Sequence, residues 1–114
     1  MSRTRLILIA LLGLTSATLV IAGSHSTPGR SGEAVFEANC ANCHTGGIGG
    51  FFTGAPEVGD QDDWAPLIPK GIDALTATTL AGVGKMEARG ECTTCTDEEI
   101  RAAIEYMLAE SQPE

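Results

Sequence analysis

Apolar positions follow a helical period most clearly near the C-terminal end of the chain. The stripe recurs at i, i+3, i+4, i+7 and i+8 and consists of Ile100, Ala103, Ile104, Met107 and Leu108. Thr96 and Glu99 stand just before it with the spacing of a capping box. The pattern predicts an amphipathic helix that begins after Thr96 and ends near residue 109, with Met107 as core filler.

Two other segments have weaker helical patterns. Ser31 can cap a helix that starts at the next residue or the one after it and leads through Phe36 to Cys40. In residues 72–80 the apolar positions lie roughly on one face, and Gly82 ends the predicted helix.

The remaining segments carry residues that break or shorten helices. Residues 45–54 contain five glycines and are predicted to form a loop whose backbone passes close to the edge of a bound cofactor. Residues 59–63 are predicted to form an acidic turn. Pro66 and Pro69 prevent a long helix in the segment that follows, so it is expected to form a short helical turn at most. Since no stretch alternates as a strand does, we predict an all-α fold with three to four short helices and long loops.

The first 22 residues have the composition of an export segment. Two arginines precede a mostly apolar run over residues 6–22. We interpret residues 1–22 as a signal peptide cleaved near Ala22. The alternative is an uncleaved membrane anchor, for which roughly 17 apolar residues is the short end of the range. Residues 23–30 are expected to be a polar linker, and residues 31–114 a single domain.

The chain is acidic, with a formal net charge of −8 over 114 residues. Without residues 1–22 the net charge becomes about −10, because all 15 acidic side chains but only five of the seven basic ones remain. Such a chain should not bind nucleic acid or an anionic lipid surface. Its charge suits redox partners that have basic docking patches. Solubility alone is the alternative explanation of the overall charge, and the simpler one.

Residues 40–44 read Cys-Ala-Asn-Cys-His, which is the C-x-x-C-H pattern of covalent haem attachment. The sulfurs of Cys40 and Cys43 can each form a thioether bond with a vinyl group of haem, and His44 can then be an axial ligand of the iron. The chain has only five aromatic residues, which is few for the core of a small domain. A bound haem would supply the missing apolar body.

Two other cysteine chemistries compete with haem. A redox dithiol usually begins a helix inside a βαβ pattern, which this sequence lacks. A zinc site could use all four cysteines, but the separation from Cys43 to Cys92 is longer than the usual zinc spacing, and His44 would have no role. Haem attachment is therefore the favoured interpretation.

Met86 is the favoured second axial ligand. It lies in a predicted loop between glycines, where the backbone can bring a thioether to the iron, whereas Met107 belongs to the stripe of the last helix. Methionine opposite histidine is typical of electron-transfer haem. The alternative is that Met86 fills a gap in the core, which would leave an open haem site, as in an enzyme or gas sensor.

Cys92 and Cys95 form a second C-x-x-C pair, but no histidine follows it, so a second haem is not expected. In an exported protein a local disulfide is favoured, and it would rigidify the segment between Met86 and the last helix. A redox-active dithiol is the alternative.

Over residues 31–108 the chain resembles the class I c-type cytochromes, and within them the cytochrome c5 group of bacterial electron carriers. Three groups of residues carry the resemblance: Cys40–His44 after a helix with Gly32 and Phe36; Ala55-Pro56 followed by Gly59-Asp60 and Trp64-Ala65-Pro66; and Gly84-Lys85-Met86 followed by Cys92–Cys95, the capping box and Tyr106-Met107.

The resemblance implies a compact helical fold around one haem, in which the first and last helices cross near Gly32, Phe36 and Tyr106. It further implies specific roles for six residues: Met86 as axial ligand, Cys92 and Cys95 as a disulfide, the Pro56 carbonyl as acceptor for the ring N–H of His44, and Trp64 beside a haem propionate. Glu87 and Ala88 stand where the family often has prolines, and the glycine-rich segment 45–54 is longer than usual.

The predicted function is that of a periplasmic mono-haem cytochrome that carries single electrons between respiratory redox partners and is not an enzyme. Its partners are expected to be redox proteins, with no nucleic acid among them, and it would contact a membrane only through an uncleaved N-terminus. An open-site haem enzyme or gas sensor, in which Met86 does not bind iron, is the alternative.

Overall fold

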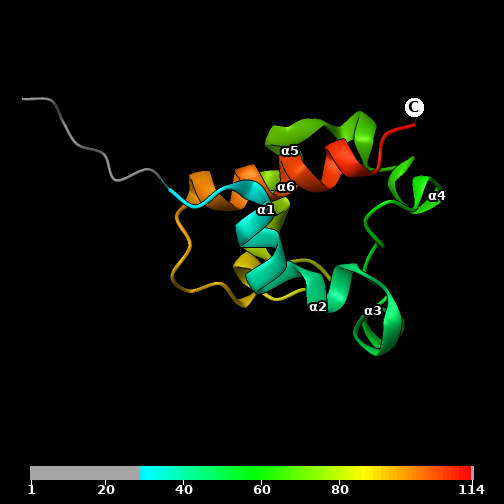
Figure 1. Ribbon diagram of the computed structural model, residues 1–114, viewed down its shortest axis with the longest axis horizontal. Coiled ribbons are helices and arrows are strands. Elements are labelled where there is room, and N and C mark those ends of the chain that lie inside the picture. Colours follow the sequence, from blue (N-terminus) through cyan, green and yellow to red (C-terminus); the bar gives the residue numbers. More distant parts are fainter. Residues whose placement is uncertain (1–28, 114) are drawn as a thin grey trace, which may run out of the picture.

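In the computed structural model, the part of the chain that the structure describes is residues 29–113 (Figure 1). The predicted signal peptide or anchor, and most of the predicted linker, lie outside it. The elements are α1 (Gly32–Val35), the π-helical η1 (Phe36–Cys40), α2 (Ala41–His44), α3 (Gly47–Thr53), α4 (Gln61–Trp64), the 3₁₀ turn η2 (Ile68–Lys70), α5 (Gly71–Ala81), η3 (Ala88–Glu91) and α6 (Asp97–Glu110).

Residues 29–113 contain no strand, and an isolated bridge joins Val83 to Met86. The predicted all-α class is therefore confirmed. Among the same residues, no helix combines the length and the apolar character needed to cross a membrane.

The predicted first helix is present and runs further than expected. The Ser31 hydroxyl accepts the N–H of Ala34, and α1, η1 and α2 then follow one another directly to His44. The middle part is a π-helical turn, a widened geometry that is common near functional sites. It ends at Cys40, so the helical path delivers Cys40, Cys43 and His44 within about one turn.

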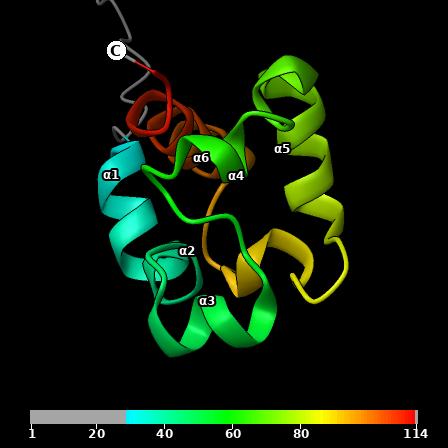
Figure 2. The ribbon, with the colours of Figure 1, turned by 90° about the vertical axis from the view of Figure 1, so that its right-hand side faces the viewer.

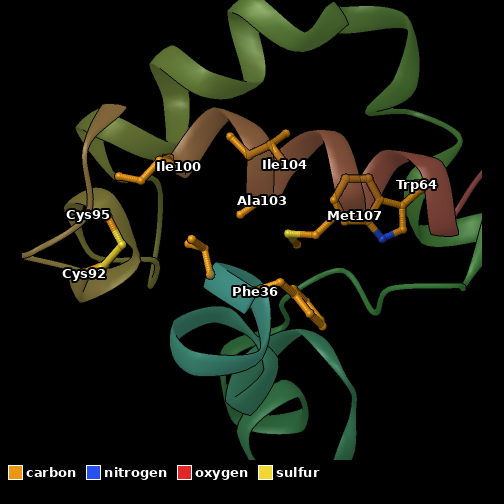
Figure 3. Close-up of a cluster of buried hydrophobic side chains, with 9 residues drawn as sticks. Phe36, Trp64, Cys92, Cys95, Ile100, Ala103, Ile104 and Met107 are labelled. Carbon is orange, nitrogen blue, oxygen red and sulfur yellow. A yellow bond between two sulfur atoms is a disulfide. The ribbon is translucent and has the colours of Figure 1, made fainter. Parts of the chain in front are cut away.

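The predicted C-terminal helix is confirmed, with both bonds of the capping box formed between Thr96 and Glu99. The buried apolar side chains of α6 are Ile100, Ala103, Ile104 and Met107. Of these, Ala103 and Met107 point toward the helical segment that carries Phe36 (Figure 3). The Cys92–Cys95 pair lies at the Ile100 end of this cluster, and Trp64 lies at the Met107 end.

The crossing of α1 and α6 requires glycine. A Cβ at Gly32 would collide with the carbonyl group of Ala102, so only glycine lets the two backbones touch. One turn further along, the rings of Phe36 and Tyr106 pack with centroids 5.2 Å apart. The helix crossing implied by the family resemblance is thus present.

The expectation of a loop over residues 45–54 is wrong, because residues 47–53 form helix α3. The glycines of this helix allow its backbone to approach the backbone of α2 closely. A Cβ at Gly49 would collide with the Asn42 carbonyl, and Gly50 lies against the carbonyl of Cys43. Gly46 and Gly54, both with positive φ, begin and end this helix.

The acidic turn over residues 59–63 is also helical in part. Asp60 caps α4, because its carboxylate accepts the N–H groups of Asp62 and Asp63 at 2.9 and 3.1 Å. The next two prolines then confine the chain to the short turn η2, as predicted. Helix α5 covers the predicted segment and ends at Gly82, whose φ is +82°.

An ion pair joins the start of the described chain to α6. Arg30 donates from its main-chain N–H and its Nε to one carboxylate oxygen of Glu99, at 2.9 and 3.0 Å, and from Nη2 to the other at 3.0 Å. The side-chain bond from Arg30, followed by the main-chain bonds from Arg30 and Thr96, lowers the pKa of Glu99 from 4.5 to about 2.

Because folding lowers this pKa, Glu99 should stabilise the protein fully above pH 4.5, and that contribution should disappear as the pH falls toward about 2. We predict that Glu99→Gln is less stable than the wild type at neutral pH and loses less stability on acidification. Denaturant unfolding measured along this pH range tests it. Glu98→Gln, at an exposed neighbouring position, is the control and should behave as the wild type. Parallel curves for the wild type and Glu99→Gln would contradict the assignment.

Candidate functional site

The helices enclose a cavity of about 530 Å³. Figure 2 shows α1 and α2 on one side, α5 on the other, and α6 across the top. The lining is predominantly apolar and comes from all of these helices and from the segment between α5 and α6. Its volume and character are those of a small-molecule or cofactor site.

Cys40 and Cys43 line this cavity as half-buried free thiols, one helical turn apart. Burial, followed by the nearby Cys43, raises the pKa of the Cys40 thiol. A reactive dithiol needs the opposite shift, since the thiolate is the nucleophile. The environment of Cys40 therefore does not support the redox-dithiol alternative for this pair.

His44 is buried in the cavity wall at the end of α2, and its Nδ1 lies 2.9 Å from the Pro56 carbonyl oxygen. A carbonyl oxygen can only accept, so Nδ1 carries the proton and donates it. The lone pair is then on Nε2, the form in which imidazole binds a metal. A main-chain bond from Val58 to the His44 carbonyl, at 2.7 Å, holds the Pro56 segment against α2.

Met86 lines the same cavity from the segment that follows α5. Two main-chain bonds with Val83, at 2.8 and 2.9 Å, close a tight turn around Gly84 and Lys85. On the other side, a Cβ added to Gly90 would lie 3.6 Å from the Met86 methyl carbon. The thioether is thus half-buried and held between two backbone segments.

Cys92 and Cys95 are joined in a disulfide, with their Cα atoms 5.5 Å apart. Both are buried and line the cavity. Because their sulfurs are bonded to each other, they are not available to complete a zinc site with Cys40 and Cys43.

Trp64 is buried at the end of α4 and also lines the cavity. Its indole N–H donates to the Glu57 carbonyl at 2.9 Å. With this donor occupied, Trp64 offers the apolar ring to the cavity and the N–H to the protein backbone.

Several residues of the site were not predicted from the sequence. Arg89 lines the cavity and bonds to the Cys95 carbonyl of the disulfide turn. Three residues of α5 also form part of the wall: Leu75, Thr78 and Thr79. Arg89 lies beside a glycine in a segment without a periodic pattern, so the sequence offered no basis for predicting its hydrogen-bond partners. The α5 residues were recognised as helical, but not as cavity-lining.

The sequence also left open where Phe51 and Phe52 point. They are 83% and 67% exposed, and Ile48 and Val83 are exposed as well. The Lys85 ammonium group donates to the Phe52 carbonyl at 2.6 Å, which joins α3 to the turn that carries Met86. We refer to Ile48, Phe51, Phe52 and Val83 as the apolar patch.

The residues around the cavity fit a haem. Two thiols at C-x-x-C spacing can form thioether bonds, an imidazole and a thioether can ligate iron, and the apolar lining suits a porphyrin. In its absence a small domain would have a large apolar hollow at its centre, which is unfavourable to stability.

Comparison with known proteins agrees with this chemistry. Residues 27–107 match the family described as cytochrome c oxidase, cbb3-type, subunit III. Cytochrome c-555 of Chlorobaculum tepidum is 34% identical over 96% of this chain and 99% of its own length. Cytochrome c5 of Azotobacter vinelandii is 38% identical over 68% of this chain and 92% of its own length.

Among solved structures, the chain is similar to one in the crystal structure of an electron transfer complex of nitrite reductase with cytochrome c. The TM-score is 0.64 and the identity 38%, over 71% of this chain and 94% of the other. In that complex the partner is a redox enzyme. The chain is also similar to a mono-haem ferrocytochrome c from Shewanella putrefaciens, with a TM-score of 0.59 and 36% identity over 73% of this chain and 96% of the other. The chain therefore belongs to the class I c-type cytochromes, in the group of cytochromes c5 and c-555, and is a mono-haem electron carrier rather than an enzyme.

Proposed function

We propose that Cys40 and Cys43 hold the haem through two thioether bonds and that His44 and Met86 are its axial iron ligands. The observation that carries this assignment is that all four side chains line one apolar cavity, in which the proton on Nδ1 leaves the Nε2 lone pair of His44 for a metal. Such a site would exchange single electrons and bind no substrate.

The bound haem would supply an iron that changes oxidation state by one electron. The chain's own residues limit the structural rearrangement that accompanies this change in oxidation state. Pro56 holds the His44 ring in one tautomer and orientation, Met86 would supply the second iron ligand, and the disulfide braces the segment beyond Met86. The apolar walls, Trp64 among them, exclude water from the site.

The assignment of Met86 predicts a specific spectral change. Met86→Ala should abolish the weak red absorption band of a thioether–ferric iron bond, lower the reduction potential and open the ferrous protein to carbon monoxide. Met107→Leu, a substitution of similar volume in the core on α6, is the control. It should keep the absorption band and the reduction potential of the wild type and should remain closed to carbon monoxide. A wild-type protein that already binds carbon monoxide rapidly, with a ferric spectrum unchanged in Met86→Ala, would instead support the open-site enzyme or sensor.

We propose that the apolar patch is the docking surface for the redox partner. Three of its members lie on one face of α3, at i, i+3 and i+4, and Lys85 bonds the turn that follows Val83 to the same helix. Exposed apolar side chains that gather in this way mark interaction sites. The patch borders the cavity, because its neighbours Thr53, Gly54 and Gly84, and Val83 itself, line the wall. No charged residue occurs between Thr45 and Pro56, whereas the chain as a whole carries a net charge of −8.

This combination fits one kind of partner, a redox protein with an apolar contact surface surrounded by basic residues. The apolar centres would set the final contact, and the opposite net charges would accelerate the encounter. By analogy with the related cytochrome found in complex with nitrite reductase, we propose a periplasmic respiratory reductase or oxidase as the acceptor.

Replacing both phenylalanines of the patch tests this surface. With nitrite reductase as acceptor, Phe51→Ser combined with Phe52→Ser should reduce the second-order rate of electron transfer by about tenfold, as expected for losing a central apolar contact. Phe51→Leu combined with Phe52→Leu keeps the patch apolar and is the matched control. Reduction by ascorbate should be unchanged in both. Equal rates for the serine and leucine variants would contradict the docking proposal.

We further propose that residues 1–22 direct export to the periplasm and are removed near Ala22, with 23–30 as a linker to the haem domain. The intact mass of the protein recovered from the periplasm tests this and counts the haem groups. It should equal the chain from residue 23 onward plus one haem. A mass that retains residues 1–22, with the protein in the membrane fraction, would establish the anchor instead.

A further inference from the structure

The backbone between Met86 and the disulfide has an unusual conformation. Arg89, Gly90 and Glu91 have φ values of +63°, +57° and +64°, so three consecutive residues are left-handed. Arg89 and Glu91 are the non-glycine residues with positive φ among residues 29–113. An L-residue with a side chain is disfavoured in this region, so other contacts must hold the segment there.

The guanidinium of Arg89 provides such contacts. Its Nη2 donates to the Cys95 carbonyl at 2.7 Å, and its Nη1 donates to the Asp97 carboxylate at 2.8 Å. The Arg89 carbonyl accepts the N–H of Cys92 at 3.1 Å. Arg89 therefore bonds to both sides of the disulfide turn and to the first residue of α6, and its planar fork suits two acceptors at once.

This segment lies directly against Met86. The N–H of Gly90 bonds back to the Glu87 carbonyl at 3.0 Å, and a Cβ at Gly90 would lie 3.6 Å from the methyl carbon of Met86. On the opposite side, a Cβ at Gly82 would lie 2.8 Å from the Ala88 nitrogen and 2.9 Å from the Met86 carbonyl oxygen. The turn that carries Met86 is thus packed between the end of α5 and the left-handed segment.

We propose that Arg89 is a positioning residue for Met86, whose two guanidinium bonds hold the left-handed segment 89–91 against the methionine and so keep its thioether in the cavity. The inference rests on the proposed role of Met86 as an iron ligand. Arg89 does not touch the iron in this scheme. It acts through the backbone, by making one conformation of the turn more stable than the others.

The backbone geometry offers a matched pair of variants. Arg89→Gly removes the guanidinium bonds and also relieves the disfavoured φ, whereas Glu91→Gly relieves the same kind of φ two residues away without removing a bond of Arg89. If backbone strain alone mattered, the two variants would behave alike. If the guanidinium positions Met86, they should differ.

The experiment uses the haem-loaded protein, and imidazole as a competing ligand for the position of Met86. Displacement is followed through the thioether–ferric iron absorption band. We expect half-displacement at an imidazole concentration about tenfold lower in Arg89→Gly than in the wild type, the effect of losing charge-assisted bonds that hold the turn. Glu91→Gly should require at least as much imidazole as the wild type. Arg89→Lys should require a concentration between those of Arg89→Gly and the wild type.

Global unfolding in denaturant, followed by far-ultraviolet circular dichroism, separates positioning from general stability. Equal imidazole concentrations for Arg89→Gly and Glu91→Gly would overturn the proposal, as would a loss of global stability with unchanged displacement. If Arg89→Gly does not fold, Asp97→Asn weakens one of the two bonds, and unchanged displacement in that variant overturns it. Met86→Ala is the reference, since a band that survives there refutes the ligand assignment itself, independently of Arg89.

Discussion

The backbone contact between α1 and α6 is the constraint on which the rest of the structure depends. Gly32 allows the two helices to touch, and Phe36 packs on Tyr106 one turn further along. Arg30 and Glu99 join the same two segments at the other end of the contact. With these helices fixed, α2 and α5 face each other across a cavity that a thin side-chain core could not fill.

The two proposed iron ligands lie in segments of different backbone structure. His44 ends a continuous helical path, and its ring is held by a carbonyl whose own segment is bonded to α2. Met86 stands in a tight turn with no helix around it, and depends on its neighbours for its position. The disulfide and Arg89 lie on the side of that turn nearest α6, which places the stabilising contacts where regular structure is absent.

The chain is acidic as a whole, but residues 45–56, which include α3, carry no charged side chain of their own. Glycines bring α3 against α2 by allowing backbone contact at Gly49, and this leaves its large side chains free to face outward. Under the docking proposal, the net charge of the protein would govern the long-range encounter with a redox partner. Local contact with the apolar patch would govern the final geometry of the complex.

Local patterns were sufficient for much of the fold and the chemistry. The capping box and apolar stripe of α6, the Ser31 cap, the helix over 71–81 and the C-x-x-C-H pattern all depend on neighbours in sequence, and a side-chain period or a short motif records them. The resemblance to class I cytochromes then predicted the α1–α6 crossing and the contact of His44 with Pro56, which no local rule contains.

The failures have one physical cause. Five glycines in ten residues signal a loop when only local propensity is considered, but α3 is stabilised by a backbone contact with α2 that propensity does not include. The exposure of Phe51 and Phe52, the bonds of Arg89 and the left-handed segment 89–91 likewise depend on partners distant in space or on packing around a turn. The sequence by itself determined the first helical segment, α5, α6, the cofactor chemistry and the candidate ligands, because each depends on neighbours along the chain. Only the tertiary structure decided how Met86 is held and which side chains surround the cavity, because both depend on contacts that exist only after the helices have packed.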